Sequence, residues 1–207
     1  MLSIGLAVAA ALALAPRLPR LRQRYDDAAL APIDGRAPKA DDAGLTSTLA
    51  AWCAEGAGTG AALLPWSRPA VPVPVAVAHV PARATAAVRH FGYRLAGYHQ
   101  LDERSRLGGI LYRIGVQLRP LVWCLPRRAG TPWDDAWLVT LDDTRLAAMA
   151  RWLPRRPTLI VLEGDAVGQA ERVTAALDHA ARHGDQPVRV LVLDPAAADL
   201  THEPARA

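Results

Sequence analysis

The 207-residue sequence has no asparagine, and only one of its 24 lysine and arginine residues, Lys39, is a lysine. Enzymes that hydrolyse nucleotides on a phosphate-binding loop place a lysine on the β- and γ-phosphates, in the pattern GxxxxGK[ST]. Lys39 lies instead in a segment rich in proline and aspartate. A GC-rich coding bias toward alanine and arginine accounts for part of the shortage, but such a bias does not remove an essential lysine. The shortage therefore argues against ordinary nucleotide hydrolysis.

Other shortages exclude further classes of protein. The two cysteines, Cys53 and Cys124, have neither the spacing of metal ligands nor that of a disulfide framework. No serine lies in a G-x-S-x-G turn, which argues against an α/β-hydrolase. The net charge is +4, but the arginines are dispersed among acidic residues, as on an ordinary solvated surface. A nucleic-acid partner is therefore not expected.

The amino terminus has the pattern of a membrane anchor. Residues 1–15 are apolar and uncharged, and four arginines follow within residues 17–24. A cleaved secretory signal carries its positive charge before the apolar stretch, whereas arginines after it place the following chain in the cytoplasm. Fifteen helical residues span about 22 Å against a hydrocarbon core of about 30 Å, a gap that arginine snorkelling and local thinning reduce. The sequence predicts a single-pass anchor in the cell inner membrane; the alternative is an interfacial or buried helix.

Composition divides the rest of the chain into three parts. Residues 16–44 form a linker rich in Pro, Arg and Asp, residues 45–195 an α/β domain, and residues 196–207 a flexible tail. Apolar spacing and breaker residues predict the first elements of the domain. In chain order they are a helix over 45–54, a strand over 73–80, helices with apolar faces over 88–98 and 107–118, strands over 121–125 and 136–141, and a helix over 143–153.

The last part of the domain has the clearest pattern. Residues 158–162 and 188–193 are apolar runs rich in branched side chains, as in strands that are covered on both faces. A helix with an inward apolar face is expected between them, over 167–183. Strand, helix and strand in this order form a βαβ unit, whose strands are parallel. The fold class predicted is a three-layer α/β domain with a mostly parallel sheet, preceded by an apolar N-terminal helix.

Acidic residues follow both of these strands. Glu163 and Asp165 come after the first strand, and Asp194 ends the second. Open parallel sheets bind ligands at the carboxyl ends of their strands, and a carboxylate there can hold Mg²⁺ or orient a water molecule. Acidic residues in this position also cap the following helix, as Asp165 could do, or are simply solvated. Both interpretations stay open at this stage.

The same region resembles a known family. The run from Leu146 to Pro195 resembles the Walker B half of STAND-type signalling NTPases, in which a basic, proline-flanked entry precedes an apolar strand that ends in acid. Residues 32–36, with Gly35-Arg36, resemble the Gly-Arg entry motif of those modules. The resemblance implies a P-loop NTPase-like fold with a nucleotide site. The sequence departs from the family because Glu163 stands where the family has aspartate.

Gly58, Thr59 and Gly60 form one candidate remnant of the phosphate loop, because their backbone amides can cradle an anion. A second candidate begins at Gly108-Gly109, which lies within a helical pattern. Ala61, however, stands where the lysine would be. Together with the apolar terminus, the missing lysine predicts a membrane-anchored, catalytically degenerate NTPase-like module. It would act as a protein-interaction or scaffold domain on the cytoplasmic face, with no catalytic residue and no cofactor. The alternative is an atypical enzyme that binds or hydrolyses Mg-ATP or Mg-GTP with the acidic residues around the ion.

Two histidines stand four positions apart in the last predicted helix, His179 and His183. Zinc ligands on helices have this spacing, because residues i and i+4 lie on one face. No glutamate lies between them and the sequence offers no evident third ligand, so exposed surface histidines are the prediction and no metal site is expected.

Overall fold

The computed structural model describes residues 42–55, 75–102, 105, 108–109, 111–112, 132–154, 156–184 and 186–202. The predicted anchor, the glycine-rich turn with Gly58, Thr59 and Gly60, and the strand over 121–125 lie outside these residues, as does most of the helix over 107–118. Within the described ranges, no helix is long and apolar enough to span a membrane.

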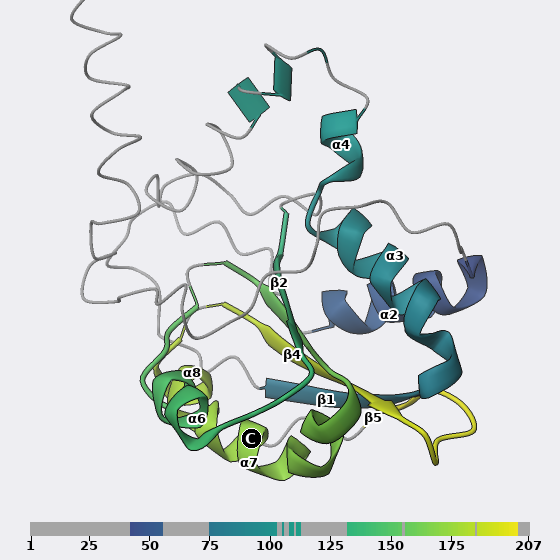
Figure 1. Ribbon diagram of the computed structural model, residues 1–207. Helices are drawn as coiled ribbons and strands as arrows, with labels where there is room; N and C mark the ends of the chain where they lie inside the picture. The colour runs from purple at the N-terminus through teal and green to yellow at the C-terminus, as the bar shows by residue number, and fades with distance from the viewer. Residues whose placement is uncertain are drawn as a thin grey trace, which may run out of the picture.

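A single sheet with the strand order β2-β3-β4-β1-β5 forms the centre of the fold (Figure 1). The strands are β1 (Val75–Pro81), β2 (Asp134–Leu138), β3 (Thr158–Leu162), β4 (Val188–Asp194) and β5 (Thr201–His202). The first four are parallel to one another, and the short β5 pairs antiparallel with β1. The predicted α/β class with a parallel sheet is thus confirmed.

The two strands with the clearest sequence pattern form the middle of the sheet. Every residue of β3 is buried, and only Asp194, the last residue of β4, is half-buried. Ile160 and Val190 are register partners with no solvent-exposed surface. Branched apolar side chains suit this position because they pack on both faces of a pleated strand.

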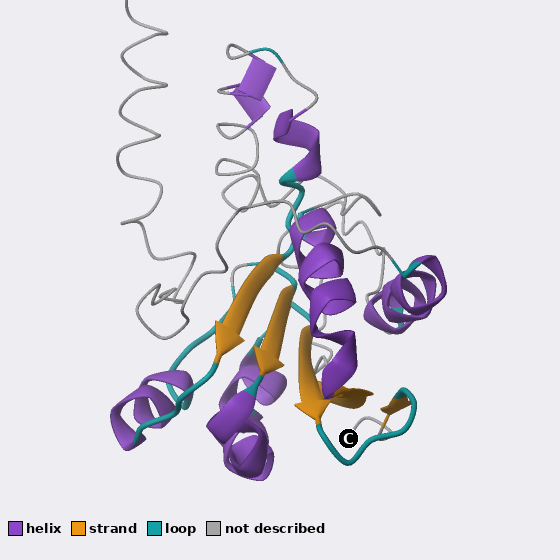
Figure 2. Ribbon diagram, turned by 45° about the vertical axis from the view of Figure 1, so that its right-hand side comes forward, coloured by secondary structure: helices purple, strands orange, loops and turns teal. Residues whose placement is uncertain are grey.

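Helices cover both faces of the sheet, which gives three layers (Figure 2). One face packs against α2 (Ala43–Ala54) and α3 (Thr85–Leu95) through a cluster that includes Trp52 and Phe91. The other packs against α6 (Asp143–Met149), α7 (Ala170–Ala176) and α8 (Asp178–His183) through Met149, Val173 and Leu177, among others. A further short helix, α4 (His99–Asp102), follows α3.

Aspartate side chains start two of the helices. Asp42 accepts a hydrogen bond from the backbone N–H of Leu45 at 3.1 Å, and Asp142 accepts one from Arg145 at 2.7 Å. These bonds satisfy backbone donors that have no partner within the helix. Because of the Asp42 cap, α2 begins at Ala43, two residues earlier than predicted.

β2 lies earlier in the chain than the predicted strand over 136–141. It begins at Asp134, whose carboxylate forms an ion pair of 3.1 Å with Arg156, so that the charge is tolerated in a mostly buried strand. It ends at Leu138, whose carbonyl accepts the N–H of Glu163 at 2.9 Å. The next carbonyl, that of Val139, accepts from Ala166 in the turn after β3, so strand pairing stops there.

The single helix predicted over 167–183 is a 3-10 helix (Gly164–Gln169) followed by α7 and α8. Backbone hydrogen bonds continue across the junction, from Leu177 N to Val173 O at 3.0 Å and from Ala181 N to Leu177 O at 2.9 Å. The two helices meet at Leu177, which is fully buried in the core. Part of the predicted tail also returns to the sheet, since β5 pairs with β1 and Arg83 donates to the carbonyl of Ala198 at 2.6 Å.

Candidate functional site at the carboxyl edge of the sheet

The carboxyl ends of the parallel strands lie at one edge of the sheet, where open α/β sheets bind ligands. The helix after β1, α3, packs on one face, whereas the helices after β2 and β3, α6 and α7, pack on the other. Connections that leave toward opposite faces open a sheet at its carboxyl edge. This edge is therefore the candidate site, and it carries the predicted acidic residues.

Glu163 has two close partners at this edge. Its Oε2 atom accepts a hydrogen bond of 2.5 Å from the indole Nε1 of Trp137 on β2, and the Nη2 atom of Arg89 on α3 lies 3.4 Å from the same oxygen. The guanidinium carbon of Arg89 is also 4.9 Å from the centre of the Trp137 ring, within the range of a cation–π contact. The three side chains form one cluster, which we call the Glu163 cluster.

Strand alternation explains why these residues meet. Leu159 and Val161 of β3 point toward the face that α3 covers, and Glu163 continues their alternation one step beyond the strand. Trp137 is the register partner of Val161 and faces the same side. Arg89 lies on α3, which packs on that face, so its side chain reaches both.

The cluster changes what the Glu163 carboxylate can do. A carboxylate that binds Mg²⁺ or activates water offers its oxygens to the ion or to the water. Here Oε2 is already engaged by an indole N–H and a guanidinium, and the positive charge of Arg89 repels a divalent cation. The Glu163 side chain is 29% exposed, so solvent only partly screens its ion pair with Arg89.

The other two predicted carboxylates do not join this cluster. Asp165 is exposed in the first turn of the 3-10 helix, whose N-cap residue makes no side-chain capping bond. Asp194 accepts a hydrogen bond of 2.8 Å from the N–H of Ala196, and its Oδ2 atom lies 3.6 Å from Nδ1 of His79. Asp194 continues the alternation of Val192, which points to the face covered by α6, α7 and α8. It therefore projects on the side of the sheet opposite to Glu163.

The turn that follows β1 differs from a phosphate-binding loop. Such a loop is rich in glycine and joins a strand to the helix after it, so that several backbone N–H groups point at the phosphates. Here β1 ends at Pro81, a 3-10 turn (Ala82–Ala84) follows, and α3 starts at Thr85. Pro81 has no N–H, the turn has no glycine, and the Thr85 hydroxyl donates to the carbonyl of Ala82 at 2.7 Å. The predicted remnant with Gly58–Gly60 precedes β1 in the chain.

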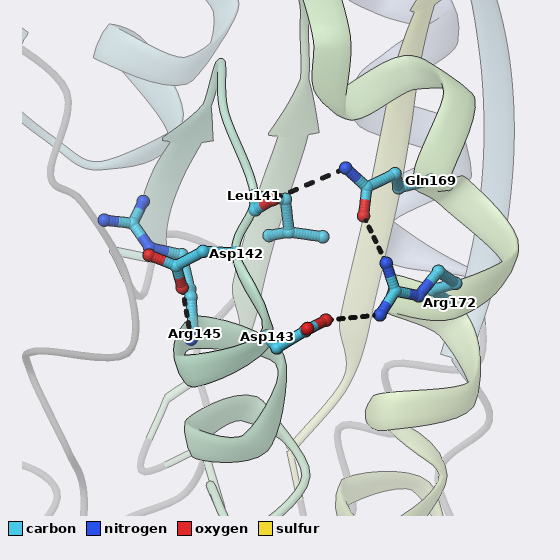
Figure 3. A network of polar contacts seen from close by, with 6 residues as sticks. All are labelled: Leu141, Asp142, Asp143, Arg145, Gln169 and Arg172. Carbon is cyan, nitrogen blue, oxygen red and sulfur yellow. Dashed lines mark hydrogen bonds and ion pairs between the residues drawn. The ribbon is translucent and has the colours of Figure 1, made fainter.

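The loop after β2 is fixed to α7 by a polar network (Figure 3). Arg172 donates to Asp143 at 2.6 Å and to Gln169 at 2.9 Å, and Gln169 donates to the carbonyl of Leu141 at 3.4 Å. With the Asp142 cap, these bonds hold the start of α6 against the helix that follows β3. The network is at the surface, so it contributes more to the shape of the edge than to stability.

Sequence reasoning found Glu163 but missed Trp137, Arg89 and His79. The position of Trp137 beside Glu163 depends on the register of β2 and β3, which local sequence patterns do not specify. His79 is the one polar side chain in the apolar run of β1, and this interruption near the carboxyl end of a strand was an available signal.

Among the residues that the structure describes, no group of three or more His, Cys, Asp or Glu side chains is arranged to hold a metal ion. Comparisons of the chain with family models, curated proteins and solved structures found no match. The site is therefore interpreted from its own geometry.

Proposed function

We propose that this chain is a membrane-anchored interaction module, whose α/β domain is a degenerate relative of P-loop NTPases and binds a protein partner on the cytoplasmic face. The observation that carries the proposal is the engagement of Glu163 by Trp137 and Arg89. The residue in the position of a catalytic carboxylate serves as a bridge between a strand, a helix and the turn after β3.

The turn after β1 supports the same interpretation. With Pro81 at its start and no glycine, it offers a triphosphate few of the converging N–H groups that a phosphate loop supplies. The only lysine of the chain, Lys39, precedes β1 by many residues and does not follow this strand. With no such cradle in the described turn after β1 and no lysine near it, the parallel sheet serves as a rigid frame for the loops.

The test joins a stability measurement to an activity measurement. We would compare the full-length protein with Glu163→Gln, Trp137→Phe and the double variant by urea denaturation, and measure Mg²⁺-dependent ATP and GTP hydrolysis for each. A double-mutant cycle should give a coupling free energy of about 1 kcal/mol between Glu163 and Trp137, because a hydrogen bond to a charged group is lost. Asp165→Asn is the matched control, since this carboxylate is exposed, and its stability should stay within about 0.5 kcal/mol of the parent.

Hydrolysis should be no faster in the parent than in Glu163→Gln. A catalytic carboxylate contributes about 100-fold or more, so a real contribution would be evident. A drop of that size in Glu163→Gln, with unchanged circular dichroism, would replace the proposal with the enzyme alternative. Thermal stabilisation by Mg-ATP or Mg-GTP would likewise contradict it, because saturation at 100 times Kd adds about 2.7 kcal/mol.

A further inference from the structure

The carboxyl group of Asp135 is enclosed on the face of the sheet that α2 and α3 cover. Trp133 and Trp137, two positions before and after it, pack in the apolar cluster on that face, and strand alternation turns Asp135 to the same side. Its register partner on β3, Leu159, belongs to this cluster too. The Oδ2 atom of Asp135 is buried without a hydrogen-bond partner in the described part of the chain. Such surroundings favour the neutral carboxyl group, because a buried charge without a partner is costly.

The helix α3 contacts this segment on both sides of Asp135. The backbone N–H of Trp133 donates to the carbonyl of Leu95, the last residue of α3, at 3.1 Å. The guanidinium carbon of Arg89, earlier in the same helix, lies 4.9 Å from the centre of the Trp137 ring. Asp135 stands between these two contacts along the chain. A separation of β2 from α3 is therefore the movement that brings water to its carboxyl group.

Within the described residues, no cation is paired with Asp135. The preceding Asp134 carries the same charge and forms an ion pair of 3.1 Å with Arg156. The elements on the face that Asp135 shares carry these charged or titratable side chains: Cys53 on α2, Arg89, His90, Tyr93 and Arg94 on α3, Glu163 after β3, and Arg189 on β4. None of them forms an ion pair with Asp135, so a carboxylate at this position stays uncompensated while β2 and α3 are in contact.

We propose that Asp135 is a proton-sensitive switch, whose ionisation loosens the contact of β2 with α3 and thereby weakens the hydrogen bond from Trp137 to Glu163. The connection is short, because Trp137 is two residues from Asp135 on the same face and its indole donates to Glu163 at 2.5 Å. Of the described strands, β2 is at the end of the sheet and pairs only with β3, so it separates more easily than an inner strand. The switch changes the shape of the carboxyl edge whether or not a partner protein binds to it.

The direction of the switch follows from the pKa of Asp135, which burial and the charge of Asp134 raise from 3.8 to about 7. An opening that exposes the carboxyl group to water lowers this pKa toward its ordinary value, so ionisation favours the open form. The Glu163 cluster is therefore intact below neutral pH and loosened above it.

The indole N–H of Trp137 reports on the switch by nuclear magnetic resonance. The full-length 15N-labelled protein in detergent micelles is titrated from pH 5.5 to 8.5, and Trp137→Phe identifies the signal among those of the six tryptophans. In the parent, the chemical shift should move with a midpoint near pH 7. In Asp135→Asn, whose side chain stays neutral at nearly the same volume, it should stay constant. The matched control Asp165→Asn removes an exposed carboxylate two positions after Glu163 and should titrate like the parent.

Hydrogen exchange of the same N–H separates an opening from a purely electrostatic effect on the chemical shift. At pH 8, exchange in the parent should be about tenfold faster than in Asp135→Asn, or more, since tenfold corresponds to an opening that lowers the pKa of Asp135 only from about 7 to about 6. The ratio of the two rates should become smaller as the pH is lowered to 5.5. Equal exchange rates at pH 8 would overturn the proposal. A chemical shift that titrates in Asp135→Asn as it does in the parent would also overturn it, and would assign the titration to another group such as His90.

Discussion

Arg189 and Trp52, which are 137 positions apart in the chain, are joined by a hydrogen bond of 3.4 Å from the guanidinium Nε to the backbone carbonyl. The same guanidinium donates to the carbonyl of Glu55 and lies 5.8 Å from the centre of the Trp52 ring. Arg189 belongs to β4 and is 2% exposed. It therefore caps the carboxyl end of α2 from inside the domain, where a positive charge complements the helix dipole.

We predict that Arg189→Met destabilises the domain by about 1–3 kcal/mol, because the terminal carbonyls of α2 lose a charged donor within the interior. Urea denaturation of the full-length protein measures the change. The control is Arg182→Met, which removes an exposed ion pair with Asp178 and should cost less than about 1 kcal/mol. Equal stabilities of Arg189→Met and the parent would show that α2 docks through its apolar side chains alone.

Cys53 lies in the same interface and should be chemically inert. Burial raises the pKa of its thiol from 9.0 to about 12, and the positive charge of Arg189 opposes the shift only in part. Since the thiolate is the reactive form, a disulfide reagent at pH 8 should not modify Cys53 in the folded protein. The measurement uses a Cys124→Ser background so that one thiol is observed, with and without urea. Rapid modification of Cys53 without urea would mean that α2 opens readily. Because Arg189 holds the end of α2, Cys53 should react faster in the Arg189→Met variant than in the parent.

The N-terminal anchor predicted from the sequence has a direct test by fractionation. If residues 1–15 cross a bilayer, the full-length protein should stay in the membrane fraction through a carbonate wash, because hydrophobic insertion resists high pH. Deletion of residues 1–15 should release it. In the control, glutamine replaces the arginines at 17, 20, 22 and 24. This change should weaken an electrostatic attachment, which salt also removes, but should not release an inserted helix. Recovery of the intact chain in the soluble fraction would contradict the anchor.

The strands β3 and β4 were predictable because burial on both faces requires continuous apolar runs, and few other structures do. The shift of β2 was not, since the charge of Asp134 at the start of the strand is balanced by a tertiary ion pair with Arg156. Sequence patterns record what a residue is and what its near neighbours are, whereas that pair depends on tertiary packing. For the same reason, sequence patterns did not predict the role of Arg189 within the apolar run of β4. They also did not predict the contact of Trp137 with Glu163.

Asp135, next to that ion pair on β2, has an unusual environment. Burial, together with the charge of the neighbouring Asp134, raises the pKa of its carboxyl from 3.8 to about 7. Within the described part of the chain, its Oδ2 atom is buried without a hydrogen-bond partner. An acid with a higher pKa in the folded than in the unfolded state destabilises the fold as pH rises between the two values.

The pH dependence follows from that difference. Below about pH 4 the carboxyl is protonated in both states and has no effect on stability. As pH rises toward 7, mainly the unfolded state ionises, so the free energy of unfolding falls; from about pH 8 the penalty is constant at roughly 4 kcal/mol. We therefore predict that Asp135→Asn is more stable than the parent at pH 8 by about this amount, and that the difference shrinks as pH falls toward 4. Urea denaturation at several pH values measures it, with the exposed Asp178→Asn as the control, whose difference from the parent should stay small throughout. A difference for Asp135→Asn that does not change between pH 4 and 8 would mean that the carboxyl has the same pKa in the folded and the unfolded protein.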